Sequence, residues 1–302
     1  MRIGTLRDGI TVRPALIEGD RAFRLDDILG AMGGVPVAVP DGADAAAVLA
    51  SPELAAAARA AAAELPSLIP RGAAPSYPFD ALGPPVLRPG KIVCAGRNYA
   101  DHARELGNAV PTRPILFAKL VTSLRGPFDD VVRPREVDDL DYEAELCVVI
   151  GAGGRRIPKD RVLERVVGYC CANDVSARNA QLGLGDQWLR GKSFDSFCPI
   201  GPWIVTTDEI PDPQVLTVRC RVDGTTRQDG RTADMIFDVA TLIAYISDAF
   251  TLEPGDLILT GTPSGVAMGQ QPAPWLQPGQ LCEVEIPGIG TIANRIVAEG
   301  AV

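Results

Sequence analysis

Residues 140–150 read LDYEAELCVVI, in which two glutamates open an apolar run that Gly151 closes. The run predicts a strand that enters the core, and Glu143 and Glu145, at positions i and i+2, would point to the same face of it. The rise of a strand separates their carboxylates by roughly 7 Å. Like charges at the edge of a core repel each other unless a cation or a proton intervenes, so the pair predicts one or the other at this position.

A third acid, Asp174, follows another apolar stretch, residues 166–171 (VVGYCC). Oxygen ligands without clustered histidine or cysteine suit Mg²⁺, Mn²⁺ or Ca²⁺ better than zinc. Glu143, Glu145 and Asp174 are therefore candidate ligands for one of these hard ions.

The same chain carries a control for this interpretation. Glu283 and Glu285 have identical spacing in residues 281–286 (LCEVEI), but there the acids alternate with apolar residues. Such alternation is typical of a half-exposed strand, so this second pair is expected to lie on a solvated face. Spacing alone favours that interpretation for any isolated Glu-x-Glu, because charged residues are seldom buried unless they are paired. The uninterrupted apolar run and Asp174 distinguish the first pair.

The composition narrows the class of protein. A chain of 302 residues with a net charge of −9 is not expected to bind nucleic acid or an anionic membrane, although a small anionic substrate needs only a few local cations. The seven cysteines form no C-x-x-C pair, which predicts reduced, buried thiols. The start of the chain lacks a signal-peptide apolar region, and no stretch approaches a membrane span. We predict a soluble, cytoplasmic protein.

The composition and the expected secondary structure change at two points along the chain. Residues 1–70 read as a small N-terminal α/β domain, with short strands in residues 2–24 and an alanine-rich helix over residues 44–65 that ends near Pro66. Residues 71–90 are rich in proline and glycine and read as a linker. Residues 91–302 are dominated by short strands and turns, which predicts a mainly β (α+β) catalytic domain built as a closed roll or sandwich.

Three elements of the large domain can be placed from the sequence. Residues 215–222 alternate and end in Asp223-Gly224, a hairpin signal. Residues 234–250 have helical spacing, and residues 254–261 return to a strand.

The single histidine, His102, precedes Glu105 by three residues. On a helical turn this spacing places both side chains on one face, where a carboxylate can fix the tautomer of an imidazole that activates water. From spacing alone, an exposed histidine with an incidental ion pair is the better interpretation.

Several cations could meet a substrate oxyanion. Lys192 lies among turn residues and aromatics, and Lys119 is flanked by apolar residues; either could neutralise a substrate charge or be a solvated loop cation. Arg178 could pair with a local acid or reach an anionic ligand. The loop at residues 260–265 (TGTPSG) could grip a carboxylate through backbone N–H groups, although a tight turn is the simpler explanation.

Taken in order, these segments resemble the fumarylacetoacetate hydrolase family along most of residues 91–302. Each motif is weak alone, and seven in the family's order are specific. The matching segments are residues 96–99 (GRNY) with Asp101-His102, Phe117-x-Lys119, residues 141–146 (DYEAEL), 173–178 (NDVSAR), 191–195 (GKSFD), 260–265 (TGTPSG) and 286–290 (IPGIG). One departure is Asn179, where many relatives carry aspartate; we expect it to affect local pairing more than the metal.

The resemblance implies a mixed β-sandwich roll, a homodimer and one divalent ion per subunit, Mg²⁺ or Mn²⁺ with Ca²⁺ as an alternative. The metal ligands would be the three acids named above, and the catalytic residues would be His102, Glu105 and Lys192. Substrate-binding roles fall on Arg97, Tyr99, Lys119, Arg178 and Thr262.

The chemistry implied by the resemblance acts on a small anionic 2-oxo acid. The first expectation is a hydrolase that cleaves a carbon–carbon bond in acylpyruvate-like 2,4-dioxo acids and releases pyruvate and a carboxylic acid. Tautomerisation, isomerisation or decarboxylation of related 2-oxo acids needs the same stabilised enolate, so these reactions stay open. A catalytically silent binding protein is the third alternative.

Overall fold

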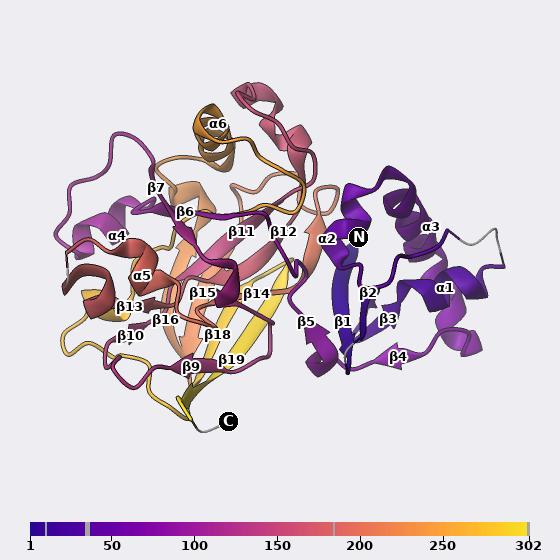
Figure 1. Ribbon diagram of the computed structural model, residues 1–302, viewed down its shortest axis with the longest axis horizontal. Helices are drawn as coiled ribbons and strands as arrows, with labels where there is room; N and C mark the ends of the chain where they lie inside the picture. The colour runs from indigo at the N-terminus through magenta and orange to yellow at the C-terminus, as the bar shows by residue number, and fades with distance from the viewer. Residues whose placement is uncertain (10, 34–36, 184, 301–302) are drawn as a thin grey trace.

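Strands dominate the molecule, as the sequence predicted. The computed structural model describes residues 1–9, 11–33, 37–183 and 185–300. Figure 1 shows a smaller N-terminal part, in indigo and violet, beside a larger part rich in β-strands. The predicted mainly β (α+β) class is confirmed.

The N-terminal part begins with three antiparallel strands that confirm the prediction for residues 2–24. The single helix predicted over residues 44–65 is wrong, because Ser51 adopts an extended conformation and accepts a hydrogen bond from the Leu54 N–H, which starts a second helix. Pro66 lies inside that helix. The elements are β1 (Arg2–Asp8), β2 (Thr11–Glu18), β3 (Arg21–Arg24), α1 (Leu25–Ala31), α2 (Ala45–Ala50), α3 (Pro52–Leu68), β4 (Ser76–Tyr77) and β5 (Leu82–Gly83).

In its described residues, the larger part contains two large packed sheets, a two-stranded sheet of β10 and β13, and three α-helices. The elements are β6 (Ile92–Gly96), α4 (Ala100–Glu105), β7 (Ile115–Lys119), β8 (Leu124–Arg125), β9 (Val131–Arg133), β10 (Leu140–Asp141), β11 (Ala144–Ile150), β12 (Val166–Asn173), β13 (Ser176–Ala177), α5 (Trp188–Lys192), β14 (Cys198–Thr206), β15 (Thr217–Val222), β16 (Thr225–Arg231), α6 (Val239–Ala249), β17 (Leu257–Leu259), β18 (Leu281–Ile286) and β19 (Gly290–Ala298). The main path of the large sheet runs β4-β3-β2-β1-β14-β12-β11-β17-β6-β7, and the smaller sheet runs β16-β15-β18-β19-β9.

Strand β11 lies in the middle of the large sheet and is buried along its whole length. Leu146 and Val148 face the core shared with the smaller sheet, whereas Cys147 and Val149 belong to a second core that the N-terminal helices cover. A strand buried on both faces needs an uninterrupted apolar run, which explains residues 146–150. One expectation is wrong: β11 begins at Ala144, so Glu143 precedes the strand.

The remaining predicted elements are present with shifted limits. Strands β15 and β16 form the hairpin around Asp223-Gly224. Helix α6 begins after Asp238, whose side chain accepts from the Thr241 N–H, rather than at residue 234. Strand β18 alternates half-buried and buried positions, so Glu283 and Glu285 lie on a half-exposed face as expected.

Strand pairing joins the N-terminal part to the larger part. Strand β1 pairs with β14 through Arg2 and Ile3, and the short strands β4 and β5, within residues 71–90, pair with β3 and β1. The division into residues 1–70, 71–90 and 91–302 stays a prediction, and its limit at Val302 lies outside the described residues.

All seven cysteines are buried and unpaired, as predicted. None of the helices in the described part of the chain has the length and apolar character needed to cross a membrane.

Candidate active site

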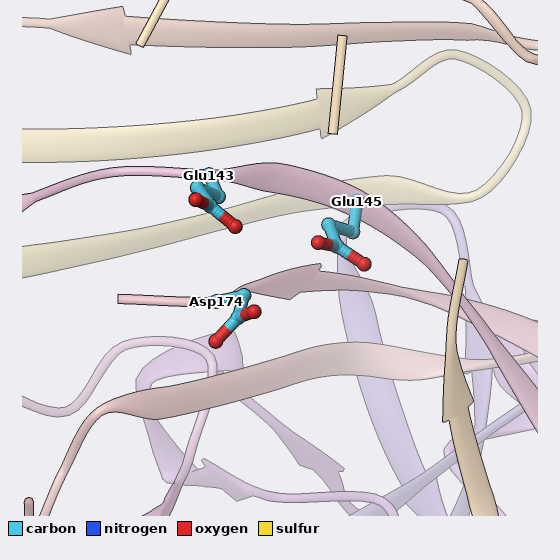
Figure 2. A group of neighbouring side chains, drawn as sticks. All are labelled: Glu143, Glu145 and Asp174. Atoms are coloured by element: carbon cyan, nitrogen blue, oxygen red, sulfur yellow. The ribbon is translucent and has the colours of Figure 1, made fainter. Parts of the chain in front are cut away.

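Three carboxylates meet where β11 begins and β12 ends. Glu143 precedes β11, Glu145 is its second residue, and Asp174 follows β12, which pairs with β11 through Ala144 and Asn173. One carboxylate oxygen from each acid lies within 4.8 Å of the others, and the side chains converge in Figure 2. All three are buried. The structure therefore brings together the acids that the sequence singled out.

The backbone fixes this arrangement. The Asp174 N–H donates to the Glu143 carbonyl at 2.9 Å, and the Glu143 N–H donates to Asn173 Oδ1 at 3.0 Å. Glu145 Oε2 accepts from the Gly261 N–H at 2.7 Å. The backbone of the loop at residues 260–265 therefore binds a carboxylate of the protein itself, that of Glu145.

Three buried cations surround the acids. Lys192 Nζ lies 2.6 Å from Glu143 Oε2 and 2.8 Å from Asp174 Oδ2. Lys119 Nζ lies 2.6 Å from Asp174 Oδ1, and Arg178 Nη2 lies 2.7 Å from Glu143 Oε1. No cation among the described residues forms an ion pair with Glu145.

Because cations of the described chain pair with Glu143 but not with Glu145, the pKa values of the two glutamates shift in opposite directions. Burial opposes ionisation of Glu143, but Lys192 and Arg178 outweigh it and hold the pKa of that carboxyl well below its usual range. Burial, with Asp174 and Glu143 nearby, raises the pKa of Glu145 well above its usual range. A buried carboxylate with no cation partner, next to two others, fits the donor set of a hard divalent ion.

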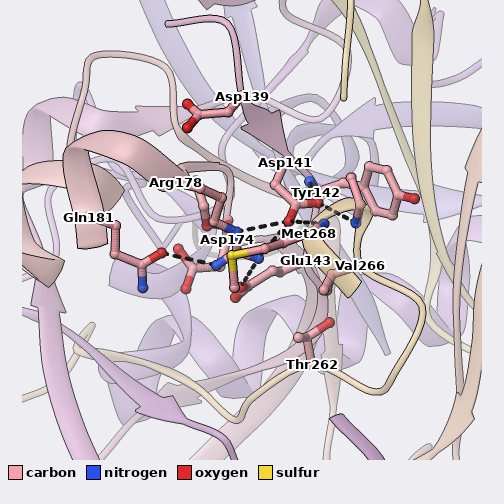
Figure 3. Close-up of polar contacts among 12 residues, drawn as sticks. Asp139, Asp141, Tyr142, Glu143, Asp174, Arg178, Gln181, Thr262, Val266 and Met268 are labelled. Carbon is pink, nitrogen blue, oxygen red and sulfur yellow. Dashed lines mark hydrogen bonds and ion pairs between the residues drawn. The ribbon is translucent and has the colours of Figure 1, made fainter. Parts of the chain in front are cut away.

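Asp141 holds the cation that supports Glu143. Arg178 Nη2 lies 2.8 Å from Asp141 Oδ2, and Arg178 Nη1 donates to Gln181 Oε1 at 3.0 Å. Asp141 also accepts from the N–H groups of Ala267 and Met268, at 2.7 and 3.1 Å. The buried aspartate therefore ties the turn after β17 to the arginine, as Figure 3 shows.

His102 and Glu105 form the expected pair on α4. The distance from His102 Nδ1 to Glu105 Oε1 is 2.8 Å, and Glu105 Oε2 accepts from the Gly265 N–H at 2.9 Å. His102 is only 4% exposed, so the interpretation as an exposed histidine is wrong. The carboxylate fixes Nδ1 and leaves Nε2 as the ring nitrogen available to a ligand.

A cavity of about 50 Å³ lies beside Glu143 and His102, whereas Glu145 and Asp174 are outside its lining. Its lining includes six of the predicted site residues, which are Arg97, His102, Glu143, Arg178, Lys192 and Thr262. The remaining lining residues are Ala95, Gly96, Leu106, Asn108, Phe117, Gln181, Leu182, Trp188 and Met268.

Three residues expected to bind substrate have other contacts. Lys119 is committed to Asp174 and to the Val175 carbonyl, and the hydroxyl of Thr262 donates to the Ala144 carbonyl and accepts from Gln228. Tyr99 is buried away from this lining, and its hydroxyl has no partner in the described chain. Their roles toward a substrate stay predictions.

Several residues of the cavity lining were not predicted from the sequence. Gln181 follows Arg178 by three residues, a spacing that could have linked the two. Trp188 could pack or line a pocket on sequence grounds, with packing favoured; it lines the cavity and contacts Phe117 edge-on at 5.3 Å between ring centroids. Asn179, the residue that departs from the family pattern, is exposed, and its N–H donates to Asp139.

Similarity to known proteins decides the family. Residues 91–297 match the family described as fumarylacetoacetate (FAA) hydrolase C-terminal. The chain belongs to the fumarylacetoacetate hydrolase family.

Relatives within this family carry more than one activity in their names. Oxaloacetate tautomerase Fahd2a, mitochondrial, of Rattus norvegicus is 46% identical over 239 residues, which are 79% of this chain and 74% of the relative. The 2,4-didehydro-3-deoxy-L-rhamnonate hydrolase of Sphingomonas sp. is 48% identical over 215 residues, 71% of this chain and 75% of the relative.

The fold is shared along the whole chain. The crystal structure of 5-carboxymethyl-2-hydroxymuconate delta-isomerase from Mycobacterium smegmatis has a TM-score of 0.73 and 31% identity, and the match covers 99% of this chain and 100% of that one. Because relatives include a mitochondrial protein, the cytoplasmic location of this chain stays a prediction.

Proposed function

We propose that this member of the fumarylacetoacetate hydrolase family is a divalent-metal-dependent tautomerase, which interconverts the enol and keto forms of a small 2-oxo acid. The observation that carries the proposal is the cavity lined by His102, Lys192 and Glu143, the last of which belongs to the acid cluster. The tautomerase and isomerase names among its relatives favour this reaction over the acylpyruvate hydrolysis expected first.

Glu143, Glu145 and Asp174 would hold the ion, with Mg²⁺ expected and Mn²⁺ or Ca²⁺ as alternatives. When bound, such an ion stabilises negative charge that develops on the 2-oxo oxygen of the substrate. The donor set supports a hard ion, because all three ligands are carboxylates and Glu145 has no ion-pair partner in the described chain.

The residues of the chain supply the proton transfer. His102 Nε2 takes the proton of the enol hydroxyl and returns a proton to C3, so the substrate changes only the position of its hydrogen and its double bond. Glu105 keeps the imidazole in the required tautomer, since it accepts from Nδ1. The ammonium of Lys192 stabilises developing oxyanion charge from within a buried site.

Hydrolysis of an acylpyruvate is the second candidate. Two observations favour it: the 48% identity to the 2,4-didehydro-3-deoxy-L-rhamnonate hydrolase, and the His102–Glu105 pair, whose imidazole could deprotonate a water. Decarboxylation would need the same stabilisation of enolate charge and stays an alternative.

The test follows the ultraviolet absorbance of enol-oxaloacetate as it ketonises, with Mg²⁺, with Mn²⁺ and with chelator. We expect acceleration well above the metal-only rate, and a loss of at least 100-fold in kcat/KM in His102→Ala. Ketonisation at the metal-only rate, with metal shown to be bound, would refute the proposal. Release of pyruvate from a panel of acylpyruvates in the same preparation would favour the hydrolase instead.

A further inference from the structure

One edge of β11 loses its strand partner beside the acid cluster. β17 ends at Leu259, and just after it the Thr260 N–H donates to the Leu146 carbonyl at 3.1 Å. Ala144, two residues before Leu146, directs its N–H and its carbonyl to the same edge, because backbone groups alternate between the two edges of a strand. Ala144 is fully buried, so both groups need partners in place of β17.

Gln228 on β16 and Thr262 supply these partners. Gln228 Oε1 accepts from the Ala144 N–H at 2.9 Å, and the Thr262 hydroxyl donates to the Ala144 carbonyl at 2.9 Å. Gln228 Nε2 in turn donates to the Thr262 hydroxyl at 2.7 Å and to the Pro263 carbonyl at 2.8 Å. The glutamine is 1% exposed, and its acceptor and both of its donors are in use.

These hydrogen bonds act on the backbone between two candidate metal ligands. The Ala144 N–H belongs to the peptide group that joins it to Glu143, and its carbonyl belongs to the peptide group that joins it to Glu145. Gln228 holds the first peptide group, and Thr262 holds the second. The direction of a strand side chain follows the backbone on either side of it, so the two hydrogen bonds orient the two carboxylates relative to each other.

The same glutamine holds the loop at residues 260–265. The Gly261 N–H, near the start of the loop, donates to Glu145 at 2.7 Å, and the Gly265 N–H, at its end, donates to Glu105 at 2.9 Å. Gln228 binds the loop between these two glycines. One buried amide therefore connects the acid cluster with the carboxylate that fixes the imidazole.

β16, which carries Gln228, packs tightly on this loop. A Cβ on Gly265 would come within 2.2 Å of the Arg227 carbonyl oxygen, and a Cβ on Gly230 would come within 2.4 Å of Pro263. The two glycines permit a contact that side chains at these positions would prevent. This contact keeps the Gln228 amide within reach of the loop and of β11 at once.

We propose that Gln228 is a positioning residue, which sets the orientation of Glu143 and Glu145 and, through the loop, that of the His102–Glu105 pair. The inference rests on the proposed function for the ion that the acids hold and for the reaction. Gln228 lies outside the cavity lining, so it acts through the backbone and not by touching a substrate. An amide that only stabilised the fold would change neither the metal site nor the turnover of the folded protein.

The test compares two glutamines with matching contacts. Gln214 Oε1 accepts from the Val239 N–H at 2.9 Å, and Gln214 Nε2 donates to the Thr232 carbonyl at 2.7 Å, outside the acid cluster and the cavity lining. Gln228→Leu and Gln214→Leu remove these contacts with a side chain of similar size. Urea unfolding measures stability, calorimetry measures Mn²⁺ affinity, and electron paramagnetic resonance of bound Mn²⁺ reports the symmetry of its ligands. Ketonisation of enol-oxaloacetate at saturating Mn²⁺ gives kcat.

We expect both variants to lose stability. Gln228→Leu should also weaken Mn²⁺ binding at least tenfold, alter the resonance of the bound ion and lower kcat at least tenfold. Gln214→Leu should keep the Mn²⁺ affinity and kcat of the wild type within twofold. Wild-type Mn²⁺ affinity and resonance in Gln228→Leu would overturn the inference, as would equal losses of Mn²⁺ affinity in both variants or a wild type that binds no Mn²⁺.

The positioning role and the reaction can fail separately. Mn²⁺ binding that depends on Gln228, in a wild type that does not accelerate ketonisation, would refute the proposed tautomerase and leave the positioning role standing. Should Gln228→Leu not fold, as judged by circular dichroism, Gln228→Asn decides alone. Its amide is one methylene too short to hold β11 and the loop together, so its Mn²⁺ affinity must fall at least threefold for the inference to hold.

Discussion

At the scale of single residues, two glutamate pairs of equal spacing have different environments. Glu145 is 1% exposed without an ion-pair partner in the described chain, whereas Glu283 is half-exposed on β18. Burial next to two other acids is what makes Glu145 a candidate ligand.

The Glu145→Gln substitution should weaken Mn²⁺ binding at least tenfold, because it removes one ligand charge. The glutamine oxygen can still accept from the Gly261 N–H, so we expect the fold to survive. Calorimetry with Mn²⁺ measures the change, and Glu283→Gln is the control of matched spacing. Equal Mn²⁺ affinity in both variants would argue against the metal site.

Asp141 is a buried acid that pairs with Arg178. The Asp141→Asn substitution should lower the free energy of unfolding by about 2 kcal/mol, because it weakens charged hydrogen bonds to Arg178 and to the turn after β17. Urea unfolding measures the loss. Asp138→Asn serves as the control, since Asp138 is 94% exposed and should change stability by less than about 0.5 kcal/mol. A similar small effect in both variants would contradict this account.

At the scale of elements, β12 must lie close to β14 to place Asp174. A Cβ at Gly168 would come within 2.3 Å of the Val205 carbonyl oxygen, and backbone atoms inside a sheet have little room to move. Gly168→Ala should therefore destabilise the protein by about 2 kcal/mol or more.

The matched control is Gly30→Ala on α1, where an added Cβ meets nothing within 4 Å. There alanine should be neutral or stabilise by up to about 1 kcal/mol, since glycine is a poor helix former. Thermal unfolding of both variants checks the contrast, and a stable Gly168→Ala would show that the sheet can shift at this strand.

At the scale of the whole molecule, we propose that the chain forms a homodimer, as its resemblance to the family implies. Leu120 and Leu189 are 51% and 47% exposed, and the Leu120 N–H donates to Ser193, the residue just after the helix that carries Leu189. Exposed apolar side chains on neighbouring segments suit an interface.

Analytical ultracentrifugation should give twice the chain mass of 31.9 kDa for the wild type. Leu120→Glu should shift the protein towards the monomer, because the interface would have to bury a charge. Val215→Glu is the control, since Val215 is 67% exposed and lies on a different segment of the chain, just before β15. A wild type that sediments as a monomer would contradict the proposal.

Local patterns predicted several elements because they depend on neighbours in the chain. The apolar run after Glu145, the Asp223-Gly224 hairpin and the His102–Glu105 turn are of this kind, and the structure contains all three. The break at Ser51 was hidden by the high helix propensity of the surrounding alanines.

Pattern and motif order along the chain are enough to predict the class of fold, the family and the acids that could share a cation. Which charges are already neutralised depends on how the chain folds. Lys119 pairs with Asp174 across 55 positions, whereas Arg97 is left facing the cavity beside Trp188. Such pairings depend on distances between segments far apart in the chain, and electrostatic energy depends on those distances and on burial, which spacing along a sequence does not contain.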